Sequence, residues 1–426
     1  MSETHAILSP SSAKRWLSCA GAPAMEAGQP DSTSKYAAEG TVGHDMSAQL
    51  LRDGVALDSH LGKTYTVDGH AITVDDDLVR ACETYTRYVL ERVHYHERAG
   101  ASVMLEVEQA VPIDHITGET GATGTADTVI MAEYPDGRCI LDVIDLKLGR
   151  GVIVNAGSNP QLMMYASGSA EKFSLVFSPN EIVMHIVQPR IADGTSTAGM
   201  GPEELSDWVA KSKPRAEMAL QLLGADQATL HASLEPTTDG CRFCRAAGIC
   251  PKLREQALAT VADDFVDLDA DLKPQLDEAV MRIARSDDAH LDALFPVLDL
   301  IENWVSAVRI RVEGRLLAGA TMRNAKLVEG KRGNRAWTDA AGAETALKTM
   351  RLKVEEMYDL KLISPTTAEK LAKAQTIGPR QWKKLQELIT QPPGKPAVAA
   401  SDDTRPALVM AASPNDFADL DEEALA

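Results

Sequence analysis

The sequence predicts a mixed α/β protein, in which helices flank a central mixed sheet and a helical extension follows at the C-terminus. Three observations support this fold class. Residues 102–113, "SVMLEVEQAVPI", alternate between apolar and polar in the manner of a half-buried strand. Residues 124–149 form two apolar runs joined by a Pro-Asp-Gly turn at 135–137, which is typical of a hairpin. Helical periodicity dominates residues 272–318.

Local signals justify the elements in chain order. A first helix is expected over residues 9–19, because Ser9 can cap it and Pro10 fits its first position. A later helix over 159–172 has the same signature, with Asn159 as the N-cap. The other expected elements are helices over 36–53, 75–99 and 203–232 and a strand over 181–190. This order of helices, three strands, a helix and a further strand predicts a mixed sheet that contains a hairpin.

The chain of 426 residues is long enough for two or three domains. The expected parts are a core with N-terminal helices and a cysteine cluster (1–255), a helical region (256–318), a small basic helical module (319–390), and a flexible linker with an acidic tail (391–426). The net charge of −19 argues against a protein that simply coats nucleic acid. Residues 301–400 nevertheless carry 18 basic and 10 acidic side chains, so this part of the chain can still contact phosphates.

No stretch of the sequence reaches the ~18 consecutive apolar residues of a membrane span. The first ten residues, "MSETHAILSP", lack the basic region and apolar core of a signal peptide. We therefore expect a cytoplasmic protein with no membrane partner.

The predicted hairpin brings two carboxylates together. In an antiparallel pair the numbers of paired residues have a constant sum, and a turn centred near Asp136 makes that sum about 272. Asp127 then lies opposite Asp145, with Lys147 further along the same face. Two adjacent carboxylates are costly to bury unless a cation joins them, and oxygen ligands suit Mg²⁺ or Mn²⁺.

Neighbouring segments supply more polar side chains. They are Glu106 and Glu108 on the preceding strand, Gln161 and Tyr165 on the following helix, and His44 on a helix with glycines at 40 and 43. Glu106 and Glu108 share one strand face, so either can join the carboxylates. A single D-x-K or a single helical histidine is more often structural than functional. Their combination in this order favours an active site over a charged surface.

The cysteines form a second candidate site. Cys241, Cys244 and Cys250 have the spacing C-x₂-C-x₅-C, and clustered cysteines in a chain of this kind indicate metal or redox chemistry more often than disulfides. Three thiolates leave a tetrahedral site incomplete, and Cys19 is the candidate for the fourth. Zinc is one possible occupant. Cys82 and Cys139 are expected to be ordinary buried thiols.

The order of these motifs resembles the PD-(D/E)XK nuclease superfamily, most closely its RecB-type exonuclease branch, over about residues 9–255. The segment from 124 to 168 is also similar to a phage family of formerly unknown function. The resemblance implies a restriction-endonuclease-like core and a Mg²⁺-dependent (or Mn²⁺-dependent) DNA exonuclease. It implies metal ligands at Asp127, Asp145 and one glutamate, with Glu108 preferred over Glu106 and His44 at the edge of the metal. It also implies that Lys147 acts on the attacking water or the phosphate, and that Gln161 and Tyr165 contact the DNA strand.

The same resemblance bears on the cofactor and the partners. Some RecB-type nucleases place one cysteine before the core and three after it around a [4Fe–4S] cluster, so this cluster is favoured over Zn²⁺ at Cys19, Cys241, Cys244 and Cys250. The implied partners are linear duplex ends or single-stranded DNA, a single-strand annealing or single-strand-binding protein, and a possible second copy of the chain, in phage recombination within a bacterial cell. The alternatives are an inactive DNA-binding or scaffold protein on the same fold and an endonuclease. Polarity and strand preference stay open.

Overall fold

A computed structural model describes residues 6–29, 35–260, 273–274, 288–326, 365–373 and 377–386. The chain divides into one unit at 1–327 and a second at 328–426. Within the second unit the structure describes helices α15 (Pro365–Lys373) and α16 (Pro379–Gln386). The predicted linker and acidic tail at 391–426, and most of the predicted basic module, lie outside the described residues. The domain boundaries expected within 1–390 therefore stay predictions.

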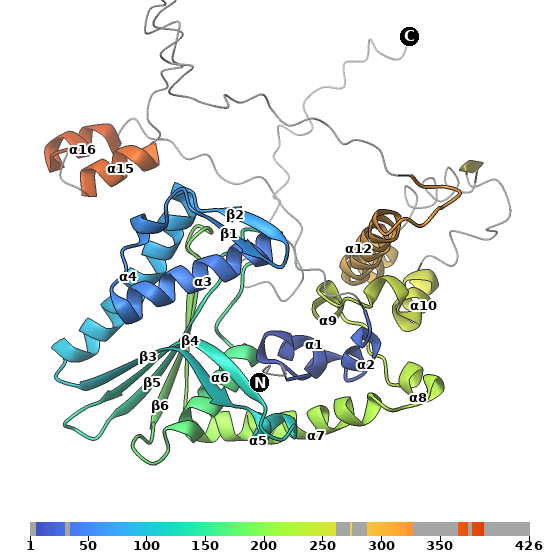
Figure 1. Cartoon of the computed structure of the whole chain (residues 1–426), viewed down its shortest axis with the longest axis horizontal. Coiled ribbons are helices and arrows are strands. Elements are labelled where there is room, and N and C mark those ends of the chain that lie inside the picture. Colours follow the sequence, from blue (N-terminus) through green and yellow to red (C-terminus); the bar gives the residue numbers. More distant parts are fainter. Residues whose placement is uncertain are drawn as a thin grey trace, which may run out of the picture. The chain divides into compact units, whose positions relative to one another are not determined.

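A five-stranded mixed sheet forms the centre of the first unit, with strand order β3-β4-β5-β6-β7 (Figure 1). Its strands are β3 (Ser102–Pro112), β4 (Thr123–Glu133), β5 (Cys139–Leu146), β6 (Glu181–Val187) and β7 (Thr195–Met200). Strands β5 and β6 are parallel, and every other neighbouring pair is antiparallel. The helix that connects the parallel pair is α6 (Pro160–Lys172). The mixed α/β fold class and the predicted hairpin are confirmed.

The register of the β4–β5 hairpin is the predicted one. Thr128 pairs with Ile144 and Met131 pairs with Leu141, so the paired numbers sum to 272. Continued by one residue, this register sets Asp127 opposite Asp145. The register follows from the short turn and the alternating pattern, because a slip by one residue would turn every buried side chain to the other face.

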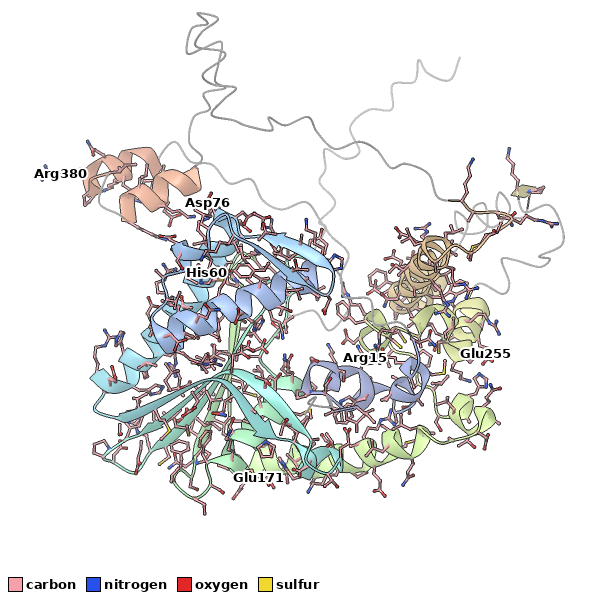
Figure 2. All side chains as sticks on the ribbon, viewed as in Figure 1. Arg15, His60, Asp76, Glu171, Glu255 and Arg380 are labelled. Atoms are coloured by element: carbon pink, nitrogen blue, oxygen red, sulfur yellow. The ribbon has the colours of Figure 1, made fainter. Side chains whose placement is uncertain are left out.

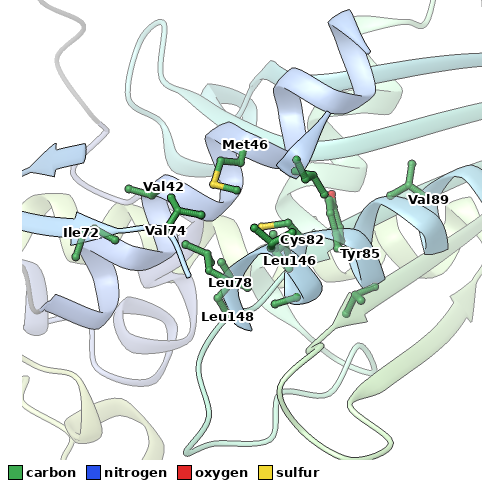
Figure 3. Close-up of a cluster of buried hydrophobic side chains, with 14 of the residues drawn as sticks. Val42, Met46, Ile72, Val74, Leu78, Cys82, Tyr85, Val89, Leu146 and Leu148 are labelled. Atoms are coloured by element: carbon green, nitrogen blue, oxygen red, sulfur yellow. The ribbon is translucent and has the colours of Figure 1, made fainter. Parts of the chain in front are cut away.

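Helices α3 (Lys35–Asp53) and α4 (Asp76–Arg98) cover one face of the sheet (Figure 1). Asp75 caps α4, since its side chain accepts a hydrogen bond from the Leu78 N–H at 2.9 Å. Side chains from both helices and from β5 share one apolar cluster, in which Leu78 and Leu146 are fully buried (Figure 3). This cluster fixes α3, and with it His44, over the open end of the hairpin, where Asp127 and Asp145 lie.

Helix α6 covers the opposite face and begins at its predicted N-cap. The Asn159 side chain accepts hydrogen bonds from the N–H groups of Gln161 and Leu162. Near the other end of α6, a Cβ on Gly168 would lie 2.4 Å from the carbonyl oxygen of Pro112, so only glycine allows this approach to β3. The cap thus fixes the first turn of α6, which carries Gln161, and the close approach at Gly168 holds the later part of the helix against β3.

The structure describes further helices in the first unit. They are α1 (Ala13–Ser18), α2 (Ala22–Glu26), α5 (Asp114–Thr117), α7 (Pro202–Leu222), α8 (Gln227–Ala232), α9 (Thr238–Arg242), α10 (Pro251–Thr260) and α12 (Asp288–Leu317), with short 3₁₀ turns at Pro10–Ser12, Leu57–His60 and Ala247–Ile249. Trp16 of α1 is buried in a cluster with residues of α5 and α7. In the part of the chain that the structure describes, no helix has the length and apolar content needed to cross a membrane.

The structure contains two features that the sequence analysis does not predict. A small hairpin, β1 (Thr64–Val67) with β2 (His70–Thr73), turns through Asp68 and Gly69, both of which have positive φ. Strand β7 adds an edge to the main sheet. The Asp-Gly pair is a known signal for a tight hairpin turn. Strand β7, "TSTAGM", has few of the branched and aromatic residues that mark strands.

Two glycines on α3 give a matched test of the packing. A Cβ on Gly40 would meet no atom within 4 Å, whereas a Cβ on Gly43 would lie 2.2 Å from Leu148 Cδ1. We expect Gly40→Ala to raise the free energy of unfolding by about 0.5–1 kcal/mol, because alanine is the better helix former. We expect Gly43→Ala to lower it by about 1–3 kcal/mol through overpacking. Urea unfolding of both variants measures the two effects, and equal shifts would contradict the packing described.

Candidate functional site

The candidate site lies at the end of β5 and beside the first half of β4, away from the hairpin turn. Asp127 on β4 has its Oδ2 atom 2.7 Å from the N–H of Leu146, which donates a hydrogen bond to it. Asp145 on β5 is buried, with only 1% of its side chain exposed. The Asp127 carboxylate is thus held by the backbone of the neighbouring strand β5, and its charge interacts with that of Asp145.

Asp145 is connected to Lys147 and to helix α6. Its Oδ2 atom lies 2.8 Å from Lys147 Nζ but accepts no well-formed hydrogen bond there, while its Oδ1 atom accepts one from Gln161 Nε2 at 2.9 Å. Gln161 Oε1 in turn accepts from Lys147 Nζ at 3.0 Å. Gln161 Nε2 also lies 3.2 Å from the hydroxyl of Tyr165. Gln161 therefore links the Asp145 carboxylate to the Lys147 ammonium group. Its contact with a DNA strand, which the resemblance implies, stays a prediction.

Glu108 reaches the carboxylates through an unusual backbone conformation. The flanking pairs, Val107 with Thr128 and Gln109 with Ala126, set it opposite Asp127, and its φ is +49°. A non-glycine residue with positive φ is uncommon and strained, and such strain concentrates at functional sites. Arg52 of α3 donates two hydrogen bonds to the carbonyl of Val107, which holds the backbone next to Glu108.

His44 completes a group that can hold a metal ion. Its Nδ1 atom lies 3.2 Å from Asp127 Oδ1, and ligand atoms of His44, Glu108 and Asp127 lie within 4.8 Å of one another. Imidazole nitrogen and carboxylate oxygen together suit divalent ions such as Mn²⁺ and Mg²⁺. Glu106 is not part of this group.

The pKa values reflect the concentration of charge. Burial would lower the pKa of His44, but the adjacent Asp127 raises it to about 9. For Asp127 the effects are reversed: burial would raise its pKa, but the adjacent His44 holds it below its usual range. Burial and the nearby Asp127 raise the pKa of Glu108. Without a metal, protonated His44 therefore supplies the positive charge that a divalent ion would supply.

On the other side of the site, burial raises the pKa of Asp145 despite the opposing effect of Lys147. Burial alone would lower the pKa of Lys147, but the carboxylates of Asp145 and Asp127 raise it. Burial also raises the pKa of Tyr165, so its hydroxyl stays protonated. Lys147 is accordingly a cation at neutral pH.

Gly124, at the start of the GTAD motif, has a packing role that the sequence does not reveal. A Cβ at this position would lie 2.6 Å from Pro10 Cγ and 3.1 Å from Tyr165 Cε1. The glycine lets the N-terminal segment and the Tyr165 ring approach β4 together. Only the three-dimensional packing could identify this function.

The four predicted cysteine ligands, Cys19, Cys241, Cys244 and Cys250, line one cavity. The space accessible to the centre of a water molecule is about 20 Å³, above the ~10–15 Å³ that one water needs, and the rest of the lining is mostly apolar. Arg15 of α1 donates a hydrogen bond to the carbonyl of Phe243 at 3.1 Å and thereby ties α1 to the cysteine segment (Figure 2). Cys82 is buried elsewhere and Cys139 is half-buried; all six thiols are free.

Burial raises the pKa of all four thiols, that of Cys241 to about 11 and that of Cys244 to about 12. Two of the sulfurs accept backbone hydrogen bonds at 3.4 Å, Cys19 from Glu235 N–H and Cys250 from Leu253 N–H. Thiols in such an apolar cavity become thiolates only when a metal replaces their protons.

The fold and the site thus define a mixed α/β protein. It has a candidate divalent-metal site, made of a histidine and carboxylates, at the open end of a β-hairpin. The chain belongs to the family described as "Protein of unknown function (DUF2800)", whose model matches residues 5–406. Among solved structures, the chain titled "Crystal structure of SSO0001" is 14% identical, with a TM-score of 0.20. That match covers 39% of this chain and 66% of the other, just under two thirds of its length.

Proposed function

We propose that the protein is a metal-dependent DNA exonuclease that acts in phage recombination or in the processing of DNA ends. The observation that carries this proposal is the convergence of His44, Glu108 and Asp127 within 4.8 Å, beside a buried Asp145 that is paired with Lys147. Bound Mg²⁺ would lower the pKa of a water molecule and offset the charge that develops on the phosphate.

The side chains then take separate roles. Asp127 and Glu108 would hold the ion with His44 at its edge, and Asp145 beside them would be the further carboxylate ligand. The Lys147 amine, beside Asp145, orients or deprotonates the attacking water or stabilises the phosphate. Gln161 holds the Asp145 carboxylate and the Lys147 ammonium group in position through one hydrogen bond to each. The protonated hydroxyl of Tyr165 can donate a hydrogen bond to a phosphate oxygen.

The test is hydrolysis of an end-labelled linear duplex, of labelled single strands and of closed circular DNA, each with Mg²⁺ or with EDTA. We expect Mg²⁺-dependent release of short products from the linear substrates and no effect on closed circles. Cleavage of closed circles would favour an endonuclease. DNA binding without hydrolysis under any metal would favour the inactive scaffold.

We further propose that the four cysteines hold a [4Fe–4S] cluster. The four cysteines line one cavity. Their order in the chain, with one cysteine before the core and three after it, supports the cluster over zinc.

Cys19→Ser tests this assignment. We expect anaerobically purified wild type to carry about four irons per chain and a broad absorption band near ~400 nm, and we expect the variant to lose both. Loss of the cross-link between α1 and residues 241–250 should also lower the free energy of unfolding by about 2–5 kcal/mol. Cys82→Ser provides the matched control, since this thiol lies outside the cavity, and it should keep its iron. One tightly bound zinc per chain, with no iron, would overturn the proposal.

A further inference from the structure

A second cluster of possible metal ligands lies between α5 and the C-terminal end of α6. Ligand atoms of Asp114, His115 and Glu171 lie within 4.8 Å of one another. Asp114 and His115 belong to α5, and Glu171 stands near the end of α6 (Figure 2). None of these residues has a role in the proposed hydrolysis of DNA.

The His115 ring is oriented as in a metal ligand. Its Nε2 atom lies 2.7 Å from the hydroxyl oxygen of Ser167, which fixes one side of the ring. Its Nδ1 atom is buried and lies 2.5 Å from Glu171 Oε2, yet the alignment is not that of a hydrogen bond. In metal-bound histidines, the N–H group of the other ring nitrogen typically donates a hydrogen bond to a neighbouring oxygen in this way.

The carboxylates beside the ring also suit a cation. Asp114 and Glu171 bring negative charge to the cluster, which a divalent cation would balance. Asp114 is already oriented, because its Oδ1 atom accepts a hydrogen bond from the His115 N–H at 2.9 Å.

A pocket opens beside this cluster. It has a volume of about 390 Å³ and is lined by His115, Ser167 and Glu171 together with Phe177, Leu205 and Ser206, among others. A volume of this size falls within the range of small-molecule sites. Three protein ligands next to an open pocket leave coordination positions for water or for an oxygen atom of a bound molecule.

We propose that Asp114, His115 Nδ1 and Glu171 form a second binding site for a divalent transition-metal ion, with its open positions directed at this pocket. Ser167 acts as a positioning residue, because it accepts the Nε2 proton and so keeps Nδ1 free for the metal. The site is separate from the cysteine cavity and from the candidate active site, so it does not depend on the proposed nuclease activity.

The test counts Mn²⁺ ions bound by the full-length chain, because Mn²⁺ prefers carboxylate and imidazole to thiolate. The candidate active site is first disabled with the double substitution Asp127→Asn and Asp145→Asn. We expect this chain to retain one Mn²⁺, whose pulsed EPR spectrum shows coupling to an imidazole nitrogen. On the same background, Glu171→Gln and His115→Ala should each weaken binding at least about tenfold, and Ser167→Ala should weaken it less.

His94→Ala is the matched control, since His94 is an exposed residue on α4. Glu171 is half-exposed, so Glu171→Gln should fold normally and keeps the test valid if His115→Ala is unstable. The proposal is overturned if the double variant binds no Mn²⁺, or if Glu171→Gln leaves its affinity unchanged. Metal-free labelling of Ser167 by a fluorophosphonate would also overturn it, because Ser167 and His115 would then form a nucleophile and its base.

Discussion

Asp145→Asn should abolish Mg²⁺-dependent hydrolysis, with a loss of at least about 10³-fold in rate, while DNA binding persists. The substitution keeps the shape of the side chain but removes the charge that faces Lys147 and, in the proposed mechanism, the metal. Removal of a single group that stabilises transition-state charge commonly costs 10²–10³-fold, and loss of a metal ligand costs more. The measurement is the initial rate on end-labelled duplex, with binding followed by fluorescence anisotropy in Ca²⁺.

The control for this prediction uses the two glutamates of β3. Glu108→Gln should lose activity to a similar degree, because Glu108 lies with His44 and Asp127. Glu106→Gln should retain it, because Glu106 is two residues away and outside that group. If both variants are fully active, or if Asp145→Asn hydrolyses DNA at the wild-type rate, the nuclease proposal fails.

Asp142→Ala should produce the largest loss of stability, about 3–5 kcal/mol in the free energy of unfolding. Asp142 is completely buried. It accepts hydrogen bonds from His96 Nε2 at 2.6 Å, His185 Nε2 at 2.7 Å and Arg92 Nη2 at 2.7 Å. Its removal leaves two buried imidazoles and the partly buried guanidinium of Arg92 without their acceptor, and such uncompensated groups are costly. Urea unfolding measures the loss, and Glu91→Ala, which removes an exposed acid on α4 next to Arg92, is the control.

The same carboxylate predicts a dependence on pH. Burial would raise the pKa of Asp142, but hydrogen bonds from His185 and His96 hold it well below its usual range. Its contribution to stability is therefore present above about pH 4, near the pKa of an unfolded aspartate, and is lost as the pH falls further. Between about pH 4 and pH 2, wild type should lose stability more steeply than Asp142→Ala. Parallel curves for the two proteins would contradict the assigned pKa.

Much of the site could be predicted because it depends on local rules. The turn at 135–137 and the alternation of its flanking strands set Asp127 opposite Asp145, and a helix brings Gln161 and Tyr165 to one side. The choice of Glu108 over Glu106 lies beyond those rules. It depends on a positive φ that the sequence does not indicate, and on an arginine that reaches the neighbouring carbonyl from another helix.

Other features could not be predicted because their parts are far apart in the chain. Asp142 stands within an apolar strand, and its partners come from α4 and β6, more than 40 residues away on either side. The His115 cluster likewise joins α5 to the end of α6. In both cases a single polar residue in the sequence gives no sign of its partners, since only the packing of elements brings them together. Strand β7 was missed because its residues are small and polar.

The arrangement of α1 has a consequence for protein synthesis. Backbone carbonyls of Leu17 and Ser18 accept hydrogen bonds from Arg215, which follows them by almost 200 residues, and Trp16 is buried against α5 and α7. A ribosome that adds 5–20 residues per second needs roughly 10–40 s to produce that partner segment. During this interval the emerging N-terminal segment has an unburied tryptophan and no docking surface, so chaperones that recognise apolar segments on nascent chains have time to bind it.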